Sequence, residues 1–531
     1  MMPKVFEFNI SDLDVLIKKY GLRKTWINIL ATHLSPFSKF KYVLNSQEFS
    51  GHTILKSNLI EGLSIGEISI LYEYSLTFKD SKSRRDNGQY FTPDDVARFM
   101  VEMTSKFPSG TWLDPCSGIG NLSWHLTQSQ LDPEKFLMEN ILLSDKDSLA
   151  LLVARVLFTF NFQNRVSDLF TQIKDRFIEL DFLSVSEPRQ PELFSGALTM
   201  NVIPKHDFVI VNPPYLSTAE DARFETSKCR DLYGYFLENI IKSSIGFVSI
   251  TPQSFTNSTK FYSLRKLLLE NFSDITIFAF DNVPANIFKG IKFGSTNSNQ
   301  VNSTRAAITI ALNGKRSHRI TRLTRWTSQQ RASLFKSSIN DLATLNFSPE
   351  FFPKVGKPFL PVYKALIRQP RLEELLSQGK TSFPLYVPSA PRYFISALKK
   401  PVKRSSMKTL YFKDEKSRDM AYLLINSSLM YWWWRTRDGG MTLSLETLKS
   451  LPTPDFEPRK SLVSKLEESE RSNRVYKLNA GSKQENVKHP EGLIKKLNKL
   501  IVPDYADLLL SLHQNSDVNS LSFIGSAPLN S

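Results

Sequence analysis

The stretch of sequence best suited to chemistry is Asn212-Pro213-Pro214-Tyr215. It offers an amide oxygen that accepts hydrogen bonds, rigid backbone carbonyls and an aromatic plane, a set that suits a flat heterocycle bearing an exocyclic amino group. The apolar run from Phe208 to Val211 directly before it predicts a short buried strand, which the two prolines must end. Taken alone, the motif is equally compatible with an ordinary turn after a strand, so the other motifs of the chain decide between a binding site and a turn.

A glycine-containing loop follows an earlier predicted strand that begins at Thr111 and ends on Asp114. Gly118 and Gly120 let the backbone approach a ligand closely, and a helix is expected to begin near Asn121. The spacing differs from that of phosphate-binding loops, and an acid directly before the loop would repel phosphate. Asp114 instead suits a cationic or hydroxyl-bearing ligand such as S-adenosylmethionine.

Two further acids, like Asp114, stand at the end of a predicted strand or directly after one. The predicted strand Asn140–Asp145 ends on Asp145, which is placed to accept hydrogen bonds from ribose hydroxyls. Another strand is expected at Arg176–Leu180, and it is followed by Asp181 and Phe182. Because strands alternate with helices, the sequence predicts an α/β fold with a parallel, doubly wound sheet, and ligands bind such sheets outside the carboxyl ends of the strands.

A further motif, Gly88-Gln-Tyr-Phe-Thr-Pro93, lies upstream of these strands. Thr92 is expected to cap a helix, with Pro93 at its first position and Asp94 and Asp95 at the positive end of its dipole. From the residues alone, a well-capped surface helix is the alternative interpretation.

Composition narrows the class of protein. The chain has 531 residues, of which 41% are hydrophobic and 23% charged, as in soluble globular proteins of two or three domains. A net charge of +16 favours a polyanionic partner, most simply nucleic acid, over a merely basic proteome. Only two cysteines occur, Cys116 and Cys229, which excludes a disulfide framework and a cysteine zinc site and fits a reducing cytoplasm. No signal-peptide pattern and no apolar run of roughly 18 residues is found, so no membrane partner is expected.

The two ends of the chain carry weaker signals. Residues 1–80 are predicted to be helical, including 65–78, and to form a supporting or DNA-clamping extension. From about residue 321, basic and aromatic residues interleave, most densely over 398–412, which suits phosphate contacts and base stacking, with a solvated basic face as the alternative. The run Tyr431–Trp434 is expected to pack inside a buried helix rather than to form a stacking platform.

In this order, the motifs resemble those of the gamma class of amino-methyltransferases, the TaqI-type N6-adenine DNA methyltransferases of restriction–modification systems. The resemblance is carried by residues 85–320 and is less specific beyond them. It implies a Rossmann-like S-adenosylmethionine-dependent methyltransferase fold with a mixed α+β C-terminal recognition domain; the mainly helical N-terminal extension lies outside the resemblance. The expected domains are the extension at 1–80, the catalytic domain at 81–320, a DNA target-recognition domain at 321–456 and a helical region at 457–531.

The resemblance also implies roles for single residues. Asp114 would lie near the amino group of S-adenosylmethionine and Asp145 at its ribose, while Asp181 and Phe182 would hold its adenine. The implied cofactor-binding residues are Tyr90, Thr92, Asp114, Cys116, Gly118, Gly120, Asp145, Lys146, Asp181, Phe182 and Asn212. The implied catalytic residues are Asn212, Pro213, Pro214, Tyr215 and Phe288. Asn212 and the Pro213 carbonyl would hold the target amine, and Tyr215 and Phe288 would sandwich the base; no metal is implied.

The activity implied is transfer of a methyl group to N6 of an adenine flipped out of double-stranded DNA. The enzyme would act as a cytoplasmic monomer, with a cognate restriction endonuclease as a separate chain. Three alternatives stay open: the modification subunit of a type I restriction system, an RNA or protein-glutamine methyltransferase, and a non-catalytic DNA-binding protein on the same fold. The long C-terminal region argues against the first two, and the intact stretch 212–215 against the third.

Overall fold

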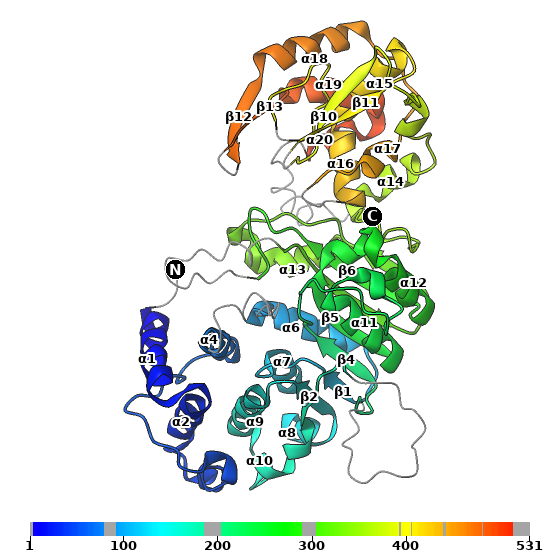
Figure 1. Cartoon of the computed structure of the whole chain (residues 1–531). Coiled ribbons are helices and arrows are strands. Elements are labelled where there is room, and N and C mark those ends of the chain that lie inside the picture. Colours follow the sequence, from blue (N-terminus) through cyan, green and yellow to red (C-terminus); the bar gives the residue numbers. More distant parts are fainter. Residues whose placement is uncertain are drawn as a thin grey trace. The chain divides into compact units, whose positions relative to one another are not determined.

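The computed structural model describes residues 4–78, 92–184, 203–288, 304–391, 394–404, 406–438, 442–479 and 482–512 (Figure 1). The chain forms two compact units. The first comprises residues 1–255, 260–276 and 286–317, and the second comprises residues 256–259, 277–285 and 318–531. The finer division into four domains with boundaries at 80, 320 and 456 stays a prediction.

The first unit begins with helices and continues as alternating strands and helices. Its helices are α1 (Lys4–Tyr20), α2 (Leu22–Leu34), α3 (Lys41–Leu44), α4 (Ile65–Leu76), α6 (Asp94–Met103), α7 (Asn121–Gln128), α8 (Pro133–Glu139), α9 (Ser148–Phe162), α10 (Leu169–Gln172), α11 (Leu232–Ser243) and α12 (Tyr262–Asn271). Its strands are β1 (Trp112–Asp114), β2 (Ile141–Asp145), β3 (Phe177–Glu179), β4 (Phe208–Val211), β5 (Gly246–Pro252), β6 (Asp274–Phe280, of which Asp274 to Thr276 belong to this unit) and β7 (Ala306–Leu312).

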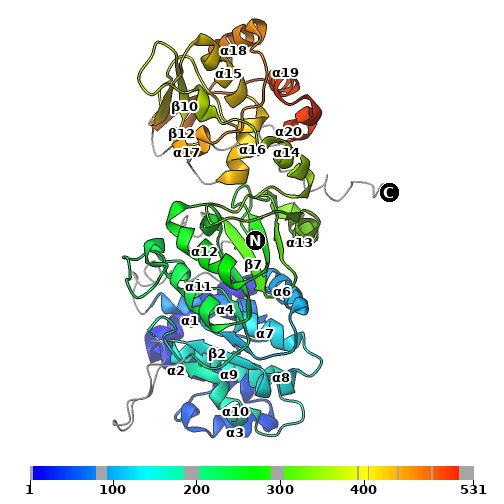
Figure 2. The same ribbon diagram turned by 90° about the vertical axis from the view of Figure 1, so that its right-hand side faces the viewer.

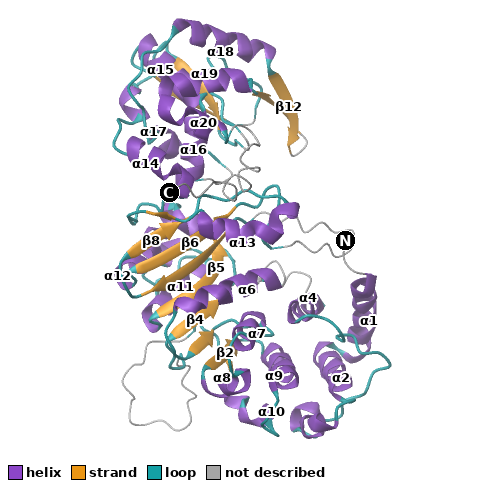
Figure 3. Ribbon diagram, turned by 180° about the vertical axis from the view of Figure 1, so that it is seen from behind, coloured by secondary structure: helices purple, strands orange, loops and turns teal. Residues whose placement is uncertain are grey.

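Within the sheet, the strands of the first unit follow one another in the order β3-β2-β1-β4-β5-β7-β6. The pairs from β3 to β5 are parallel, and β7 runs antiparallel to β5, so the predicted α/β class is confirmed. Helices α6, α7 and α9 cover one face of the sheet and α11 and α12 the other (Figure 3). Every residue of β4 is buried, because both of its faces are covered. Since the carboxyl ends of parallel strands share one edge, Asp114, Asp145 and Asn212 are brought together there.

The N-terminal helices pack directly on this layer, with α4 against α7 and α2 against α9 (Figures 1 and 2). One hydrophobic cluster contains Trp26 and Leu71 from the N-terminal helices together with Val153 from α9. The buried Arg155 of α9 also forms an ion pair with Glu48, at 2.6 Å. The predicted helix at 65–78 is present as α4. The N-terminal helices therefore share a core with the strand-and-helix part of the first unit.

The second unit combines helices with short antiparallel strand pairs, β8 with β9, β10 with β11, and β12 with β13. Its strands are β8 (Ser317–Ile320), β9 (Ala343–Thr344), β10 (Pro384–Pro388), β11 (Met407–Tyr411), β12 (Arg474–Asn479) and β13 (Ser482–Val487). Its helices are α13 (Arg331–Asn340), α14 (Leu360–Leu366), α15 (Glu415–Ile425), α16 (Ser428–Arg437), α17 (Leu445–Lys449), α18 (Lys460–Ser472), α19 (Glu491–Ile501) and α20 (Ala506–Leu510).

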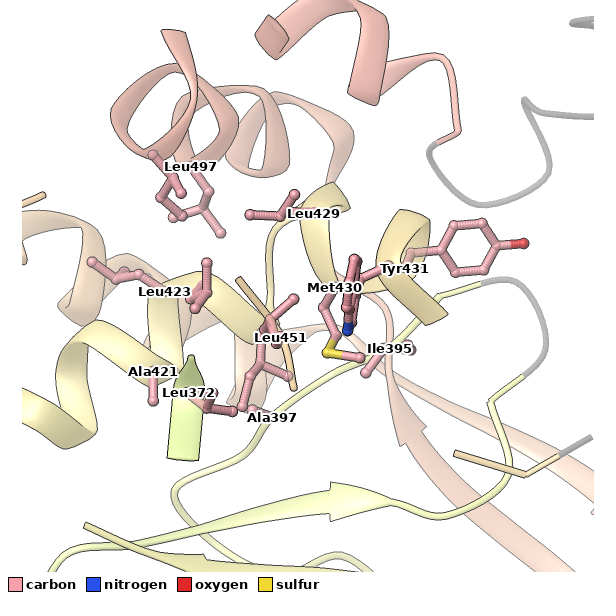
Figure 4. Packing of buried hydrophobic residues seen from close by; sticks show 14 of the residues in the cluster. Leu372, Ile395, Ala397, Ala421, Leu423, Leu429, Met430, Tyr431, Leu451 and Leu497 are labelled. Carbon is pink, nitrogen blue, oxygen red and sulfur yellow. The ribbon is translucent and has the colours of Figure 1, made fainter. Parts of the chain in front are cut away.

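The core of the second unit is built around α15 and α16, whose apolar residues meet side chains from several other elements (Figure 4). Trp432, Trp433 and Trp434 are at most 2% exposed. Trp433 donates its indole N–H to Ser450 Oγ at 3.1 Å. The expectation that this run packs inside a buried helix is therefore confirmed.

Candidate active site

A cavity of about 340 Å³ lies at the carboxyl ends of β1, β2 and β4. This volume is in the usual range for small-molecule sites. Most of the residues predicted from the sequence to bind a cofactor line it. They are Thr92, Asp114, Cys116, Gly118, Asp145, Lys146, Asp181, Phe182 and Asn212, and Pro213 and Pro214 line it as well.

The loop after β1 has the backbone that its glycines permit. Gly118 and Gly120 have φ values of 53° and 85°, in the left-handed region. A Cβ atom at Gly120 would lie 2.8 Å from the ring of Phe158, so this glycine also allows close packing of the loop on α9. Gly120 does not line the cavity but precedes α7, which begins at Asn121 as predicted.

Asp145 connects the ends of β1 and β2. Its Oδ2 accepts the backbone N–H of Gly118 at 2.8 Å, and its Oδ1 accepts that of Asp147 at 2.9 Å. Burial raises the pKa of this carboxyl above its usual range, and the two amide donors oppose that shift. The carboxylate is thus fixed in orientation at the cavity wall, where its lone pairs can accept hydrogen bonds from hydroxyl groups.

Asp114 is the most deeply buried acid of the cavity, at 1% exposure. Its Oδ2 accepts the Ser123 hydroxyl at 2.9 Å, while Oδ1 is buried without a hydrogen-bond partner in the described part of the chain. Burial raises its pKa to about 7, and the nearby Asp145 contributes to the rise. A buried carboxylate with an unused acceptor is stabilised by a cationic hydrogen-bond donor, so the residue fits an ammonium group.

Asp181 and Phe182 line the cavity after β3. Asp181 is exposed, and its Oδ1 accepts the backbone N–H of Leu183 at 3.1 Å. The Phe182 ring is 1% exposed and stacks on Phe236, with centroids 5.4 Å apart. The pair therefore presents a carboxylate next to an aromatic wall, which suits an adenine ring with its amino group.

The side chain of Asn212 is held from both sides of its amide. Its Nδ2 donates to Thr92 Oγ1 at 2.9 Å, and its Oδ1 accepts the hydroxyl of Tyr215 at 2.6 Å. The predicted capping role of Thr92 is wrong: Pro93 occupies the cap position before α6, and the Thr92 hydroxyl serves the Asn212 amide. Asn121 fixes this segment by donating to the backbone carbonyl of Thr92 at 2.7 Å.

Cys116 joins the glycine loop to the loop after β4. Its thiol donates to the backbone carbonyl of Asn212, with 3.3 Å between Sγ and the oxygen. Burial, followed by the proximity of Asp114 and Asp145, raises the pKa of the Cys116 thiol well above its ordinary value. The thiol therefore stays protonated at neutral pH and remains a donor.

Tyr215 and Phe288 lie outside the cavity lining but contact each other. Their ring centroids are 6.0 Å apart with an angle of 64° between the planes. The Tyr215 hydroxyl also lies 2.8 Å from the Ile250 carbonyl, and Phe288 is 2% exposed. In the structure the two rings meet edge to face, whereas a sandwiched base requires parallel planes on its two sides.

Several cavity residues were missed by the sequence analysis. Ser69, Tyr72, Glu73 and Leu76 come from α4, and Asp147, Leu232 and Phe236 from the elements after β2 and β4. Polar residues at helical spacing in an N-terminal extension are typical of a solvated face, so no sequence signal distinguishes the α4 residues. Tyr90 lies outside the described residues.

Among the described residues, no group of three or more His, Cys, Asp or Glu side chains is placed to hold a metal ion. Within the same ranges, every helix is too short or too polar to cross a membrane.

Two protein-family models match the chain over the region that contains the cavity. The model described as N-6 DNA Methylase matches residues 64–148, and the model described as Eco57I restriction-modification methylase matches residues 139–288. Over the matched residues, the chain is therefore similar to DNA N6-adenine methylases of restriction–modification systems. No curated protein matches the chain.

Solved structures resemble the chain at low sequence identity. The DrdV–DNA complex has a TM-score of 0.42 and 14% identity, over 73% of this chain and 48% of that chain. A modification subunit of a putative type I restriction enzyme from Vibrio vulnificus YJ016 has a TM-score of 0.32 and 15% identity, over 53% and 55%. The type IIG restriction endonuclease BpuSI has a TM-score of 0.43 and 11% identity, over 96% and 77%. The chain spans about half the length of the first two.

Proposed function

We propose that this protein is a site-specific DNA methyltransferase of the gamma, TaqI-like class, which methylates N6 of adenine in double-stranded DNA. It would act as a monomeric modification enzyme, with a restriction endonuclease as a separate chain. One observation carries the proposal: the acid-lined cavity and the Asn212–Tyr215 loop lie at the same edge of the sheet, joined by the hydrogen bond from Asn212 to Thr92.

The cavity fits S-adenosylmethionine. The unused Oδ1 of Asp114 suits the ammonium group, Asp145 the ribose hydroxyls, and Asp181 with Phe182 the adenine. Gly118 and Lys146 complete the wall beside Asp145. When bound, S-adenosylmethionine supplies an electrophilic methyl group on its sulfonium. A Rossmann-like methyltransferase fold with this cofactor also agrees with the strand order of the sheet.

Asn212 and the Pro213 carbonyl would accept hydrogen bonds from the exocyclic amino group of adenine. The lone pair of that nitrogen is delocalised into the ring, and two acceptors favour a more tetrahedral nitrogen whose lone pair is directed at the methyl group. Thr92 accepts from Nδ2 of the Asn212 amide, which directs Oδ1 toward the substrate; Oδ1 also accepts the Tyr215 hydroxyl, and its second lone pair would serve the substrate amine. Positioning and electrostatics would then supply the rate enhancement.

The target adenine is inaccessible inside duplex DNA and must flip out, at a cost of a few kcal/mol. Stacking on Tyr215 and Phe288 would offset this cost, with roughly 1–3 kcal/mol for each aromatic contact. The edge-to-face contact of the two rings then has to open when the base enters. A net charge of +16 supports salt-dependent contacts with DNA phosphates, and residues 321–456 would read the target sequence.

The test is methyl transfer by the purified full chain and by its Asn212→Ala variant. The wild-type chain is expected to form N6-methyladenine in a defined sequence of mixed DNA without any added subunit. Asn212→Ala should lose at least about 100-fold in rate, a typical effect of removing one preorganised hydrogen-bonding group, while binding S-adenosylhomocysteine almost normally. Methylation of RNA or of a protein glutamine, or an absolute requirement for a specificity subunit, would refute the proposal.

A further inference from the structure

Helix α4 of the N-terminal extension forms one side of the cavity. Ser69, Tyr72, Glu73 and Leu76 line it, and their spacing of three and four residues places them on one face of the helix. Ile68, on a neighbouring face, belongs to the hydrophobic cluster that joins the N-terminal helices to α9. The helix is therefore fixed to the first unit by its apolar residues and presents polar groups to the cavity.

Tyr72 is connected to the carboxylate of Asp145 through a single residue. Its hydroxyl donates to Asp147 Oδ2 at 2.7 Å. The backbone N–H of Asp147 in turn donates to Asp145 Oδ1 at 2.9 Å. The other oxygen of Asp147 accepts the N–H of Leu149 and so caps α9. The turn that carries Asp145 is thus held by α9 on one side and by α4 on the other.

This connection matters because two acids lie two residues apart at the cavity wall. Burial raises the pKa of Asp145, the backbone N–H groups of Asp147 and Gly118 oppose that shift, and the negative charge of the Asp147 carboxylate adds a smaller rise. The Tyr72 hydroxyl donates a hydrogen bond to Oδ2 of Asp147. This bond stabilises the negative charge of the Asp147 carboxylate and fixes its direction. Tyr72 itself is 3% exposed and its ring lies 5.1 Å from that of Trp26, so its position is set by packing.

We infer that α4 belongs to the nucleoside half of the cofactor site and that Tyr72 is a positioning residue for Asp145. The inference rests on the proposed assignment of the cavity to S-adenosylmethionine. It gives the N-terminal helices a part in binding the adenosine moiety, beside the supporting or DNA-clamping role expected from the sequence.

The experiment compares Tyr72→Phe with Tyr74→Phe in the full chain. Tyr74 lies on the same helix but donates its hydroxyl to Asp14 at 3.2 Å, and it does not line the cavity. Tyr72→Phe is expected to weaken binding of S-adenosylhomocysteine and of adenosine by the same factor, roughly tenfold, as for loss of a hydrogen bond to a charged group. It should raise KM for S-adenosylmethionine and leave kcat at saturation unchanged. Tyr74→Phe should bind both probes as the wild type does.

The outcomes separate this inference from the proposed function. A wild-type chain that fails to bind S-adenosylhomocysteine would overturn the proposed function. If the wild type binds but Tyr72→Phe binds equally well, the inference alone is overturned. It is also overturned if Tyr74→Phe weakens binding to the same extent, because both changes then act through the stability of α4, or if adenosine binding is unaffected.

Discussion

The cavity of the first unit and the tryptophan helix α16 of the second both concentrate unusual residues, yet they are built in opposite ways. Asp114 is buried next to open volume, with one oxygen lacking a hydrogen-bond partner among the described residues. Trp433 and Trp434 are each 1% exposed and lie inside a hydrophobic cluster, with their indole N–H groups bonded to Ser450 and to the Thr442 carbonyl. The residue type is thus a poor guide to function, and an adjacent cavity is a better one.

Two buried acids make the same point. Burial raises the pKa of Asp341 in the second unit to about 6, much as it raises that of Asp114 to about 7. Asp341 accepts the backbone N–H of Arg322 at 2.9 Å, and a Cβ at Gly356 would lie 2.7 Å from its Oδ1. It lines no part of the cavity described above, so a raised pKa alone does not identify a binding site.

The largest expected effect is on stability. Trp433→Ala should destabilise the second unit by about 3–5 kcal/mol, because it removes a large buried side chain that the surroundings cannot replace. Thermal melting measures the loss, and calorimetric titration should show unchanged S-adenosylhomocysteine affinity at a temperature where the variant is folded. Leu445→Ala, at a residue 43% exposed in the same unit, is the control and should change the melting temperature little. A loss of S-adenosylhomocysteine affinity in Trp433→Ala would contradict the view that α16 serves stability and the cavity serves binding.

Asp145→Ala, in contrast to Trp433→Ala, should reduce the binding affinity more than the stability. Removing its proposed hydrogen bonds to the ribose is expected to weaken S-adenosylhomocysteine binding by about 2 kcal/mol, or roughly thirtyfold. Asp175→Ala, at an exposed acid of the same unit, should leave the affinity unchanged. Unchanged affinity in Asp145→Ala, read by the same titration, would remove Asp145 from the site.

The affinity for the cofactor should depend on pH through Asp114. A cationic ligand favours the ionised carboxyl, and burial raises the pKa of the free group to about 7. The affinity is therefore expected to fall as the pH drops below 7, approaching a tenfold loss, or about 1.4 kcal/mol, per pH unit. Titrations between pH 5.5 and 8 check this, and Asp114→Asn should bind more weakly at pH 8 with a flatter profile. A wild-type profile that does not change over this interval contradicts the role.

The smallest expected effect concerns Thr92. Thr92→Val keeps the shape of the side chain but removes the acceptor for Asn212 Nδ2, so kcat should fall about fivefold, the effect of one neutral hydrogen bond of about 1 kcal/mol. Thr92→Ser retains the hydroxyl and should behave like the wild type. If Thr92→Val instead raises the dissociation constant of S-adenosylhomocysteine with kcat unchanged, the hydroxyl serves the cofactor, as the family resemblance implies.

Local sequence patterns predicted much of the first unit. Strand β4 has the predicted bounds, β1 and β2 end on the predicted acids, and α7 begins at the predicted residue, because short apolar runs, acids and glycines act through their immediate neighbours. The capping role of Thr92 was wrong, since its hydroxyl is bonded to a residue 120 positions away, which no local pattern reveals. Tyr215 and Phe288 were predicted as the two aromatic partners of the target base, but the edge-to-face geometry of their rings follows from packing.

By itself the sequence determined which residues could do the chemistry and at which strand ends they would stand, because parallel strands carry their ligand-binding loops at one edge. Only the tertiary structure decided how these groups are held. It placed Thr92 on Asn212, left one oxygen of Asp114 without a described partner, and brought Tyr72 of a distant helix to Asp147. Such contacts join segments far apart in the chain, and they depend on how whole elements pack rather than on the residues nearby.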